Sequence, residues 1–179
     1  DLDNRIAWVE PGVLNLDLSN ELGPLGFHFA PDPSSQQVCS IGGNVANNSG
    51  GPHCLAYGVT SGHVAAIEVV LPNGAVTTLG DLTSEAPGYD LRGLFIGSEG
   101  TMGVATKEAV RLTQNPPEVR TLLLDFSDVR DGAAAVSAII AAGLIPAALE
   151  MMDQRAIEVV EAFVNAGYPT EAAAVLLVE

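Results

Sequence analysis

The segment Ile41–Gly51 carries the densest set of residues that could hold a ligand. Two glycine pairs, Gly42-Gly43 and Gly50-Gly51, flank six residues that include three asparagines and one serine. Glycine lets a backbone approach a ligand closely and reach positive φ, and asparagine and serine add donors and acceptors. Because the segment contains no acid or base, it suits holding a polar, flat or phosphorylated ligand, not proton transfer. A cluster of ordinary glycine-rich turns accounts for the same composition equally well.

A second glycine-rich segment, Gly97–Gly103, stands directly before the strand-like run Val104–Leu112. Taken alone, it is typical of a tight turn that enters a strand. Neither segment matches a known phosphate motif. A P-loop needs Gly-Lys-Ser/Thr, whereas the only lysine, Lys107, lies elsewhere, and a Gly-x-Gly-x-x-Gly fingerprint does not occur.

The remaining reactive side chains do not form a recognisable catalytic or metal-binding pattern. The three histidines and two cysteines are scattered and lack metal-ligand spacing. Ser98 lies in Gly-Ser-Glu-Gly, which differs from the Gly-x-Ser-x-Gly nucleophile elbow. The sequence therefore predicts no metal site and no catalytic residue within this chain, with the thiols buried and the histidines in loops. These scattered residues are His28, His53, His63, Cys39 and Cys54.

The elements that position these segments are short strands and one helix in the first part of the chain. An Asn-Gly pair between two apolar runs is a strong hairpin signal, so Pro72-Asn73-Gly74 predicts a hairpin. Long glycine-rich loops are expected between the elements. The predicted elements are strands at Ile6–Glu10, Val64–Leu71, Ala75–Leu79 and Val104–Leu112, and a helical face over Leu14–Leu22.

The second part of the chain reads as strand–helix–strand–helix–strand, a layered arrangement of helices against a sheet whose strands could run parallel. Ser127 or Asp128 is expected to cap the first helix and Asp153 the second, with Gly143 and Gly167 ending them. The predicted strands are Val119–Phe126, Ala147–Met151 and Ala172–Val178, and the first helix is Val129–Ala142.

Composition and charge narrow the class of protein. The chain has 179 residues, 47% of them hydrophobic, which is enough for a packed core. Its formal net charge of −15 argues against binding nucleic acid, which proteins hold through exposed lysine and arginine. The sequence predicts no signal peptide and no membrane span, because the uncharged run Ala133–Leu149 is short, alanine-rich and interrupted by Gly143 and Pro146.

Glycine content divides the chain into two parts. Residues 1–115 hold 16 of the 19 glycines, and the diproline Pro116-Pro117 stops any strand or helix. We therefore expect one domain over residues 1–115 and part of another over 118–179. Because a strand-like run begins within five residues of Asp1 and another ends directly before Glu179, we also expect the chain to be a piece of a longer protein.

Taken together, the loops resemble the vanillyl-alcohol-oxidase type FAD family, in its branch of FAD-linked glycolate oxidase subunits and D-lactate dehydrogenases. The resemblance runs along the whole chain in the same order, and the joint pattern is specific where each loop alone is not. The segments that carry it are Phe29–Ser35, Cys39–Gly51, Tyr57-Gly58, Gly88–Leu91, Leu94–Val104, Ala148–Asp153 and Asn165–Pro169.

This resemblance implies an α+β fold: a second FAD-binding subdomain (1–115) followed by part of an α/β cap domain with an antiparallel sheet (118–179). It also implies residue roles. The residues that would line the flavin and its ribityl–pyrophosphate stem are Pro31, Asp32, Ser40, Gly42 and Gly43. Those that would pack against the isoalloxazine side are Asn44, Asn47, Ser49 and Gly50. Gly58 would close that loop, and Gly103 and Val104 would meet the adenine half.

The function implied is oxidation of a small 2-hydroxy acid, glycolate or D-lactate, to the 2-oxo acid by hydride transfer to flavin N5. The resemblance places the catalytic segment outside this chain, so the chain alone is expected to be inactive. It implies iron–sulfur and other partner subunits and a cytoplasmic location, peripheral to the inner membrane through those partners. Two other classes stay open: a non-catalytic flavin-binding, nucleotide-binding or electron-transfer module, and a structural domain whose glycine loops bind nothing.

Overall fold

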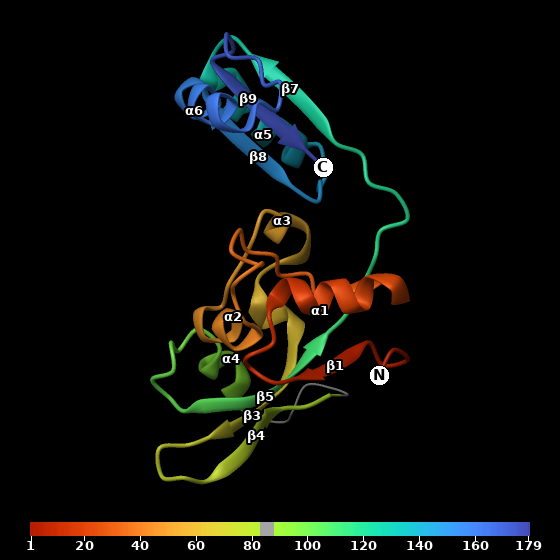
Figure 1. The fold of residues 1–179 in the computed structure, drawn as a ribbon, viewed down its shortest axis with the longest axis vertical. Coiled ribbons are helices and arrows are strands. Elements are labelled where there is room, and N and C mark those ends of the chain that lie inside the picture. Colours follow the sequence, from red (N-terminus) through yellow and green to blue (C-terminus); the bar gives the residue numbers. More distant parts are fainter. Residues whose placement is uncertain (83–87) are drawn as a thin grey trace. The chain divides into compact units, whose positions relative to one another are not determined.

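The computed structural model describes residues 1–82 and 88–179, which form two compact units (Figure 1). The first unit spans Asp1–Pro116 and the second Pro117–Glu179. The division therefore lies within the diproline Pro116-Pro117. In the part of the chain that the structure describes, no helix is long and apolar enough to cross a membrane.

A four-stranded antiparallel sheet forms the centre of the first unit. Its strands are β1 (Ile6–Val9), β3 (Val64–Val70), β4 (Val76–Gly80) and β5 (Val104–Arg111), in the order β1-β5-β3-β4. The Asn-Gly turn joins β3 to β4 as predicted: Leu71 N–H donates to Ala75 O at 2.8 Å, and Gly74 takes φ +82°. This φ favours glycine because it has no Cβ.

One face of the sheet carries the core of this unit. Ile67, Val69 and Val110 point from the strands into a cluster of buried apolar side chains. Two helices, α1 (Asn15–Leu22) and α2 (Ile41–Asn47), contribute buried residues to the same cluster. Alternation along a strand sends neighbouring side chains to opposite faces, which explains why Val110 joins this cluster whereas Ala109 belongs to a separate one with Ile6.

Short elements complete the first unit. The two-residue strands β2 (Phe27–His28) and β6 (Thr113–Gln114) pair antiparallel. The remaining elements are the 3-10 helices η1 (Gly23–Leu25) and η2 (Thr60–His63) and the one-turn helices α3 (Cys54–Tyr57) and α4 (Leu91–Phe95).

The expectation of a loop over the first glycine-rich segment is wrong, because residues Ile41–Asn47 form the helix α2. Ser40 is its N-cap, and its Oγ accepts the N–H of Gly43 at 3.1 Å. A capping hydroxyl satisfies one of the free N–H groups of a first turn, and the burial of Ile41 and Val45 adds packing energy. Together these offset the low helix propensity of two glycines.

The second unit is a three-stranded antiparallel sheet with two helices. Its strands are β7 (Leu122–Phe126), β8 (Leu149–Asp153) and β9 (Ala174–Val178), in the order β7-β9-β8. Both outer strands run antiparallel to β9, so the antiparallel sheet implied by the resemblance is confirmed and the parallel alternative is excluded. Helices α5 (Val129–Ala141) and α6 (Gln154–Val164) connect the strands.

The two helices of this unit pack on opposite faces of its sheet. A Cβ on Gly132 of α5 would contact Phe126, Met151 and Ala174 at 3.3–3.7 Å. Ile157 of α6 instead packs with Met152 and Val175, each the immediate neighbour of one of those strand residues. Since adjacent strand residues face opposite ways, α5 and α6 cover different faces.

The helix boundaries follow local capping chemistry. Asp128 caps α5, with Oδ1 accepting the N–H of Arg130 at 2.8 Å. The prediction that Gly167 ends α6 is wrong: Asn165, at φ +53°, is the C-cap and donates its N–H to Glu161 O. Asparagine tolerates this left-handed conformation better than most residues. Gly167 follows in the loop, where its N–H donates to the Glu161 carboxylate at 3.0 Å.

Removal of the α6 cap provides a test of the second unit. Asp153 Oδ1 accepts the N–H of Ala156 at 2.8 Å. We expect Asp153→Ala to lower the unfolding free energy of this unit by about 1 kcal/mol, the usual effect of losing an N-cap. Urea unfolding followed by circular dichroism measures the change, and Glu158→Ala on the exposed side of α6 is the matched control. Equal stability of the two variants would contradict the cap assignment.

Candidate functional site

A pocket of about 280 Å³ lies where α2 begins, beside the start of β5. Three parts of the first unit form its walls: the turn after β1, the first two turns of α2, and the segment that connects α4 to β5. The lining residues are Pro11, Ser40, Gly42, Val45, Ala46, Phe95, Ser98, Gly100, Gly103, Val104 and Ala105. Both glycine-rich segments singled out in the sequence therefore meet at one cavity.

Backbone hydrogen bonds hold the two glycine-rich segments together. The N–H of Gly97 donates to Val45 O at 2.8 Å, and the N–H of Glu99 donates to Ala46 O at 2.9 Å. Both acceptors lie in α2, whereas both donors lie in the segment before β5. These bonds seat the second segment against the helix, which explains how residues far apart in the sequence share one pocket.

Two pocket glycines are required by close backbone contacts. Gly42 donates its N–H to Pro11 O at 2.9 Å, and a Cβ on Gly42 would lie 2.5 Å from the Cβ of Pro11. Gly103 has φ +154°, and a Cβ there would lie 2.8 Å from both Val69 Cγ1 and Val70 O. Larger side chains at either position would force the walls apart, so the shape of the pocket depends on these glycines.

Four of the predicted cofactor residues, Ser40, Gly42, Gly103 and Val104, line this pocket. The N–H groups of the α2 first turn are already used inside the protein. Gly42 donates to Pro11 O and Gly43 to Ser40 Oγ, while Asn44 donates to Ser40 O at 3.0 Å. These residues thus let a ligand come close to the backbone, but their N–H groups are not free to bind it. The polar groups of a ligand therefore need donors from elsewhere in the site.

Ser98 supplies such a group, and the sequence reasoning did not assign it to the site. Its hydroxyl oxygen is buried and makes no hydrogen bond in the part of the chain that the structure describes. A hydroxyl can donate one hydrogen bond and accept two, so it can serve a phosphate or a ribityl oxygen. The available signal is its place inside the second glycine-rich segment, directly before β5.

Asn44 is the most deeply buried polar member of the predicted set. Its side chain is 1% exposed, and neither its Oδ1 nor its Nδ2 has a partner among the described residues. An amide left unpaired in a protein interior costs about 1–3 kcal/mol, so such a group calls for a bound partner. Asn44 therefore fits a ligand that offers both a donor and an acceptor along α2.

Asp32 belongs to a second polar cluster, with His53 and Gly51. Oδ2 of Asp32 contacts Nδ1 of His53, while Oδ1 is buried without a partner in the described chain. A Cβ on Gly51 would overlap the backbone carbonyl of Asp32. Pro31 precedes this residue, and its carbonyl accepts the side-chain N–H of the buried Asn15 at 2.7 Å. The carboxylate is thus held in a tightly packed place.

The other predicted residues make contacts within the protein. Nδ2 of Asn47 donates to Gly43 O at 2.9 Å, and the carbonyl of Ser49 accepts both the N–H and the hydroxyl of Thr60. Gly50 packs against Cys54, and Gly58, at φ +78°, ends α3. None of these residues, nor Pro31, Asp32, Gly43 or Asn44, belongs to the lining of the 280 Å³ pocket.

All three histidines contact Tyr57, although they are scattered in the sequence. The ring of His28 lies 5.8 Å from the Tyr57 ring and that of His53 lies 6.4 Å away, while Nε2 of His63 donates to Tyr57 O at 2.7 Å. The sequence reasoning missed this convergence because it depends on β2, α3 and η2 meeting. Within the described ranges, no group of three or more His, Cys, Asp or Glu side chains could hold a metal ion.

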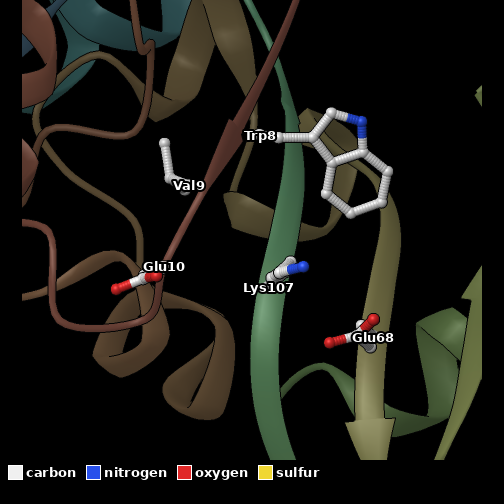
Figure 2. A pocket seen from close by; sticks show the side chains of 5 residues that line it. All are labelled: Trp8, Val9, Glu10, Glu68 and Lys107. Atoms are coloured by element: carbon white, nitrogen blue, oxygen red, sulfur yellow. The ribbon is translucent and has the colours of Figure 1, made fainter.

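A second cavity, of about 490 Å³, contains none of the predicted residues. Trp8, Val9, Glu10, Glu68 and Lys107 line it, and Figure 2 shows Trp8, Lys107 and Glu68 projecting from neighbouring strands. Thr106 donates its hydroxyl to Glu68 Oε1 at 2.7 Å. This cavity has a larger volume than the first pocket, but no residue of the two glycine-rich segments lines it.

Two family models match the chain, one in each unit. Residues 1–80 match the model described as "FAD binding domain", and residues 115–179 match "FAD linked oxidases, C-terminal domain". The pocket residues before β3 fall within the first of these matches. The second match begins at Asn115 and covers all three strands of the second unit.

Curated relatives align over nearly the entire chain. It is 50% identical over 175 residues to "Glycolate oxidase subunit GlcD" of Escherichia coli (strain K12), with 98% of this chain and 35% of the relative covered. It is 46% identical over 180 residues to the GlcD subunit of Bacillus subtilis (strain 168), with 100% and 38% covered. Against "D-lactate dehydrogenase" of Anaerostipes hadrus the identity is 35%, with 96% and 36% covered. The chain thus spans about a third of the length of these relatives.

Solved structures share the fold. An alkyldihydroxyacetonephosphate synthase superposes with a TM-score of 0.86 at 20% identity, covering 99% of this chain and 35% of the other. At this identity the likeness concerns the fold alone. It supports the α+β arrangement of both units that the resemblance implied.

Proposed function

We propose that this chain is the part of an FAD-dependent 2-hydroxy-acid dehydrogenase that holds the cofactor and begins the cap domain. Its two units match the models described as "FAD binding domain" and "FAD linked oxidases, C-terminal domain". The observation that carries the proposal is the pocket at the start of α2, where both motif segments meet beside the unpartnered Ser98 hydroxyl. The names of the relatives favour glycolate or D-lactate as the substrate. The product is the corresponding 2-oxo acid.

The residues present fit FAD in two places. Around the pocket, the ribityl–pyrophosphate stem and the adenine half would be held by Ser40, Gly42, Ser98, Gly103 and Val104, with Gly43 next to the lining. Before, along and after α2, the flavin and its ribityl chain would be surrounded by Pro31, Asp32, Asn44, Asn47, Ser49, Gly50 and Gly58. Gly42 and Gly103 would let the cofactor come close to the backbone. The buried polar atoms of Ser98, Asn44 and Asp32 without partners among the described residues would bind its polar groups.

When bound, FAD supplies flavin N5, which accepts the hydride from the α-carbon of the hydroxy acid. The chain's own contribution is binding and orientation. The hydroxyl of Ser98 would donate to an oxygen of the cofactor, and the Asn44 amide would pair with one of its polar groups. Among the residues that the structure describes, no titratable side chain lines the pocket. Removal of the substrate's hydroxyl proton therefore belongs to residues outside this pocket.

The two units take different roles in this proposal. Residues 1–115 are the second FAD-binding subdomain, and residues 118–179 begin the substrate or cap domain. The relatives are about three times as long as this chain. We therefore expect the whole enzyme to have other segments that complete the cofactor site and supply the catalytic base. We expect it to work with further subunits, among them iron–sulfur proteins that take up the electrons. We place it in the cytoplasm, peripheral to the inner membrane through those subunits.

The experiment that tests the function is an anaerobic titration of the whole flavin-loaded enzyme. We expect glycolate or D-lactate to bleach the visible absorbance of the flavin, because the hydride reduces it. The 179-residue chain, given FAD and a redox dye under the same conditions, should show no substrate-dependent dye reduction. If neither acid bleaches the flavin, the proposed substrate class is wrong. If the 179-residue chain alone turns over substrate, the proposal that the catalytic base lies outside this chain is wrong.

One alternative is that the protein binds the flavin without catalysing a reaction, as a flavin-binding or electron-transfer module. The absence of titratable side chains from the pocket lining favours it over a complete catalytic site within this chain. The titration separates the two proposals. A whole protein that binds FAD, accepts electrons from a reductant and ignores every 2-hydroxy acid would be such a module.

A further inference from the structure

The contact between Asp32 and His53 joins residues that are 21 positions apart in the sequence. Oδ2 of Asp32 meets Nδ1 of His53, and their side chains are 20% and 28% exposed. A carboxylate can only accept, so the proton between them must lie on Nδ1. A hydrogen bond between charged or partly charged groups in such a shielded place is stronger than one on the surface.

The rest of Asp32 is fixed from the opposite side and from its backbone. Gly51 lies so close that a Cβ would overlap Asp32, and the N–H of Gly51 is directed to Cys54 Sγ at 2.9 Å. The carbonyl before Asp32, that of Pro31, is bound by Asn15 at 2.7 Å. These contacts leave the Asp32 side chain little freedom to turn.

Oδ1 of Asp32 remains buried and has no partner in the part of the chain that the structure describes. A buried carboxylate oxygen without a donor is costly, and none of the described residues places an N–H or hydroxyl within hydrogen-bond distance of it. The cofactor offers donors of the required kind, namely the ribityl hydroxyls and a ring N–H of the flavin.

We propose that His53 is a positioning residue: by donating from Nδ1 to Oδ2 of Asp32, it aims Oδ1 of Asp32 at a hydroxyl or ring N–H donor of the bound flavin. This inference rests on the proposed function, because it needs a flavin at this place. His53 itself acts through Asp32. By holding Oδ2, His53 fixes the orientation of the carboxylate group, which the contacts around Gly51 and Pro31 already restrict.

The chain offers a matched set of variants. His53→Leu removes the donor, whereas His53→Asn places an amide N–H near the position of Nδ1 and keeps it. His28→Asn is the control, because His28 contacts the same Tyr57 ring at 5.8 Å but pairs with Asn115 through its Nδ1 at 3.0 Å. Urea unfolding of the flavin-free variants separates loss of fold from loss of ligand.

The test is the FAD affinity of the whole protein, measured by quenching of flavin fluorescence. We expect His53→Leu to weaken FAD binding about tenfold or more and to shift the flavin absorbance bands, because Asp32 loses its orientation. His53→Asn and His28→Asn should stay within about threefold of the parent. Unchanged affinity in a folded His53→Leu protein would overturn the positioning role alone. Failure of the parent protein to bind FAD would overturn the proposed function and, with it, this inference.

Discussion

Raising the pH from about 5 to about 8 should lower the unfolding free energy of the first unit by about 2.5 kcal/mol through one residue, Glu108. This carboxyl lies on the central strand β5, between Val9 of β1 and Ile67 of β3, and is fully buried. Neither oxygen has a hydrogen-bond partner in the described part of the chain. Burial raises the pKa of Glu108 from 4.5 to about 7.

The sign follows from proton binding. Between the two pKa values the folded state keeps the proton on Glu108 and the unfolded state releases it, so the folded state binds more protons. Stability therefore falls as the pH rises through this window and levels off above about 7. Each unit of difference in pKa corresponds to about 1.4 kcal/mol, which sets the size of the effect.

Urea unfolding of the chain at both pH values measures this dependence. Glu108→Gln cannot ionise, so we expect it to lose most of the slope and to exceed the parent in stability at the higher pH by about 3 kcal/mol. Glu21→Gln, an exposed carboxylate on α1, is the matched control and should keep the parent's slope. A Glu108→Gln variant with the parent's pH dependence would show that Glu108 does not remain protonated in the folded state.

The second large effect concerns Gly42, whose N–H donates to Pro11 O on the facing wall of the pocket. In Gly42→Ala the new Cβ would lie 2.5 Å from the Cβ of Pro11 and 3.0 Å from its carbonyl oxygen. We expect a net loss of about 2 kcal/mol of stability, because backbone must move to relieve the overlap, although alanine favours a helix. The flavin content of the whole protein should fall as well, since Gly42 lines the pocket.

Gly12→Ala is the matched control for this variant. It lies one residue after Pro11, and a Cβ there would meet no atom within 4 Å. Its unfolding free energy should stay within about 0.5 kcal/mol of the parent. Thermal or urea unfolding compares the two, and equal losses would indicate that the close contact of Gly42 with Pro11 is not a constraint.

Elements that depend on residues close together in the sequence could be predicted from it. The Asn73-Gly74 turn, the apolar run of β3 and the caps Asp128 and Asp153 were all readable, because each depends on residues a few positions apart. Glu108 could also have been noticed. It shares the period-2 face of Val110, which predicts a carboxyl pointing into the core.

Features that depend on distant contacts could not be read in this way. The helix α2 depends on Ser40 as its cap and on a core built partly by β3 and β5, and this tertiary packing overrides the low propensity of its glycines. The pairing of Asp32 with His53 likewise needs two loops to meet. The roles of the motif residues came from the resemblance, and for these positions they stay predictions.

Hydrogen–deuterium exchange of the whole protein with and without FAD tests the central claim most directly. If the pocket at the start of α2 holds the cofactor, peptides that cover Ser40–Asn47 and Ser98–Val104 should exchange more slowly when FAD is bound. Peptides that cover Trp8 of β1 and the Lys107–Arg111 part of β5, at the second cavity, should be unchanged. Unchanged exchange in both pocket segments, with protection at Trp8 and Lys107, would contradict this assignment of the site.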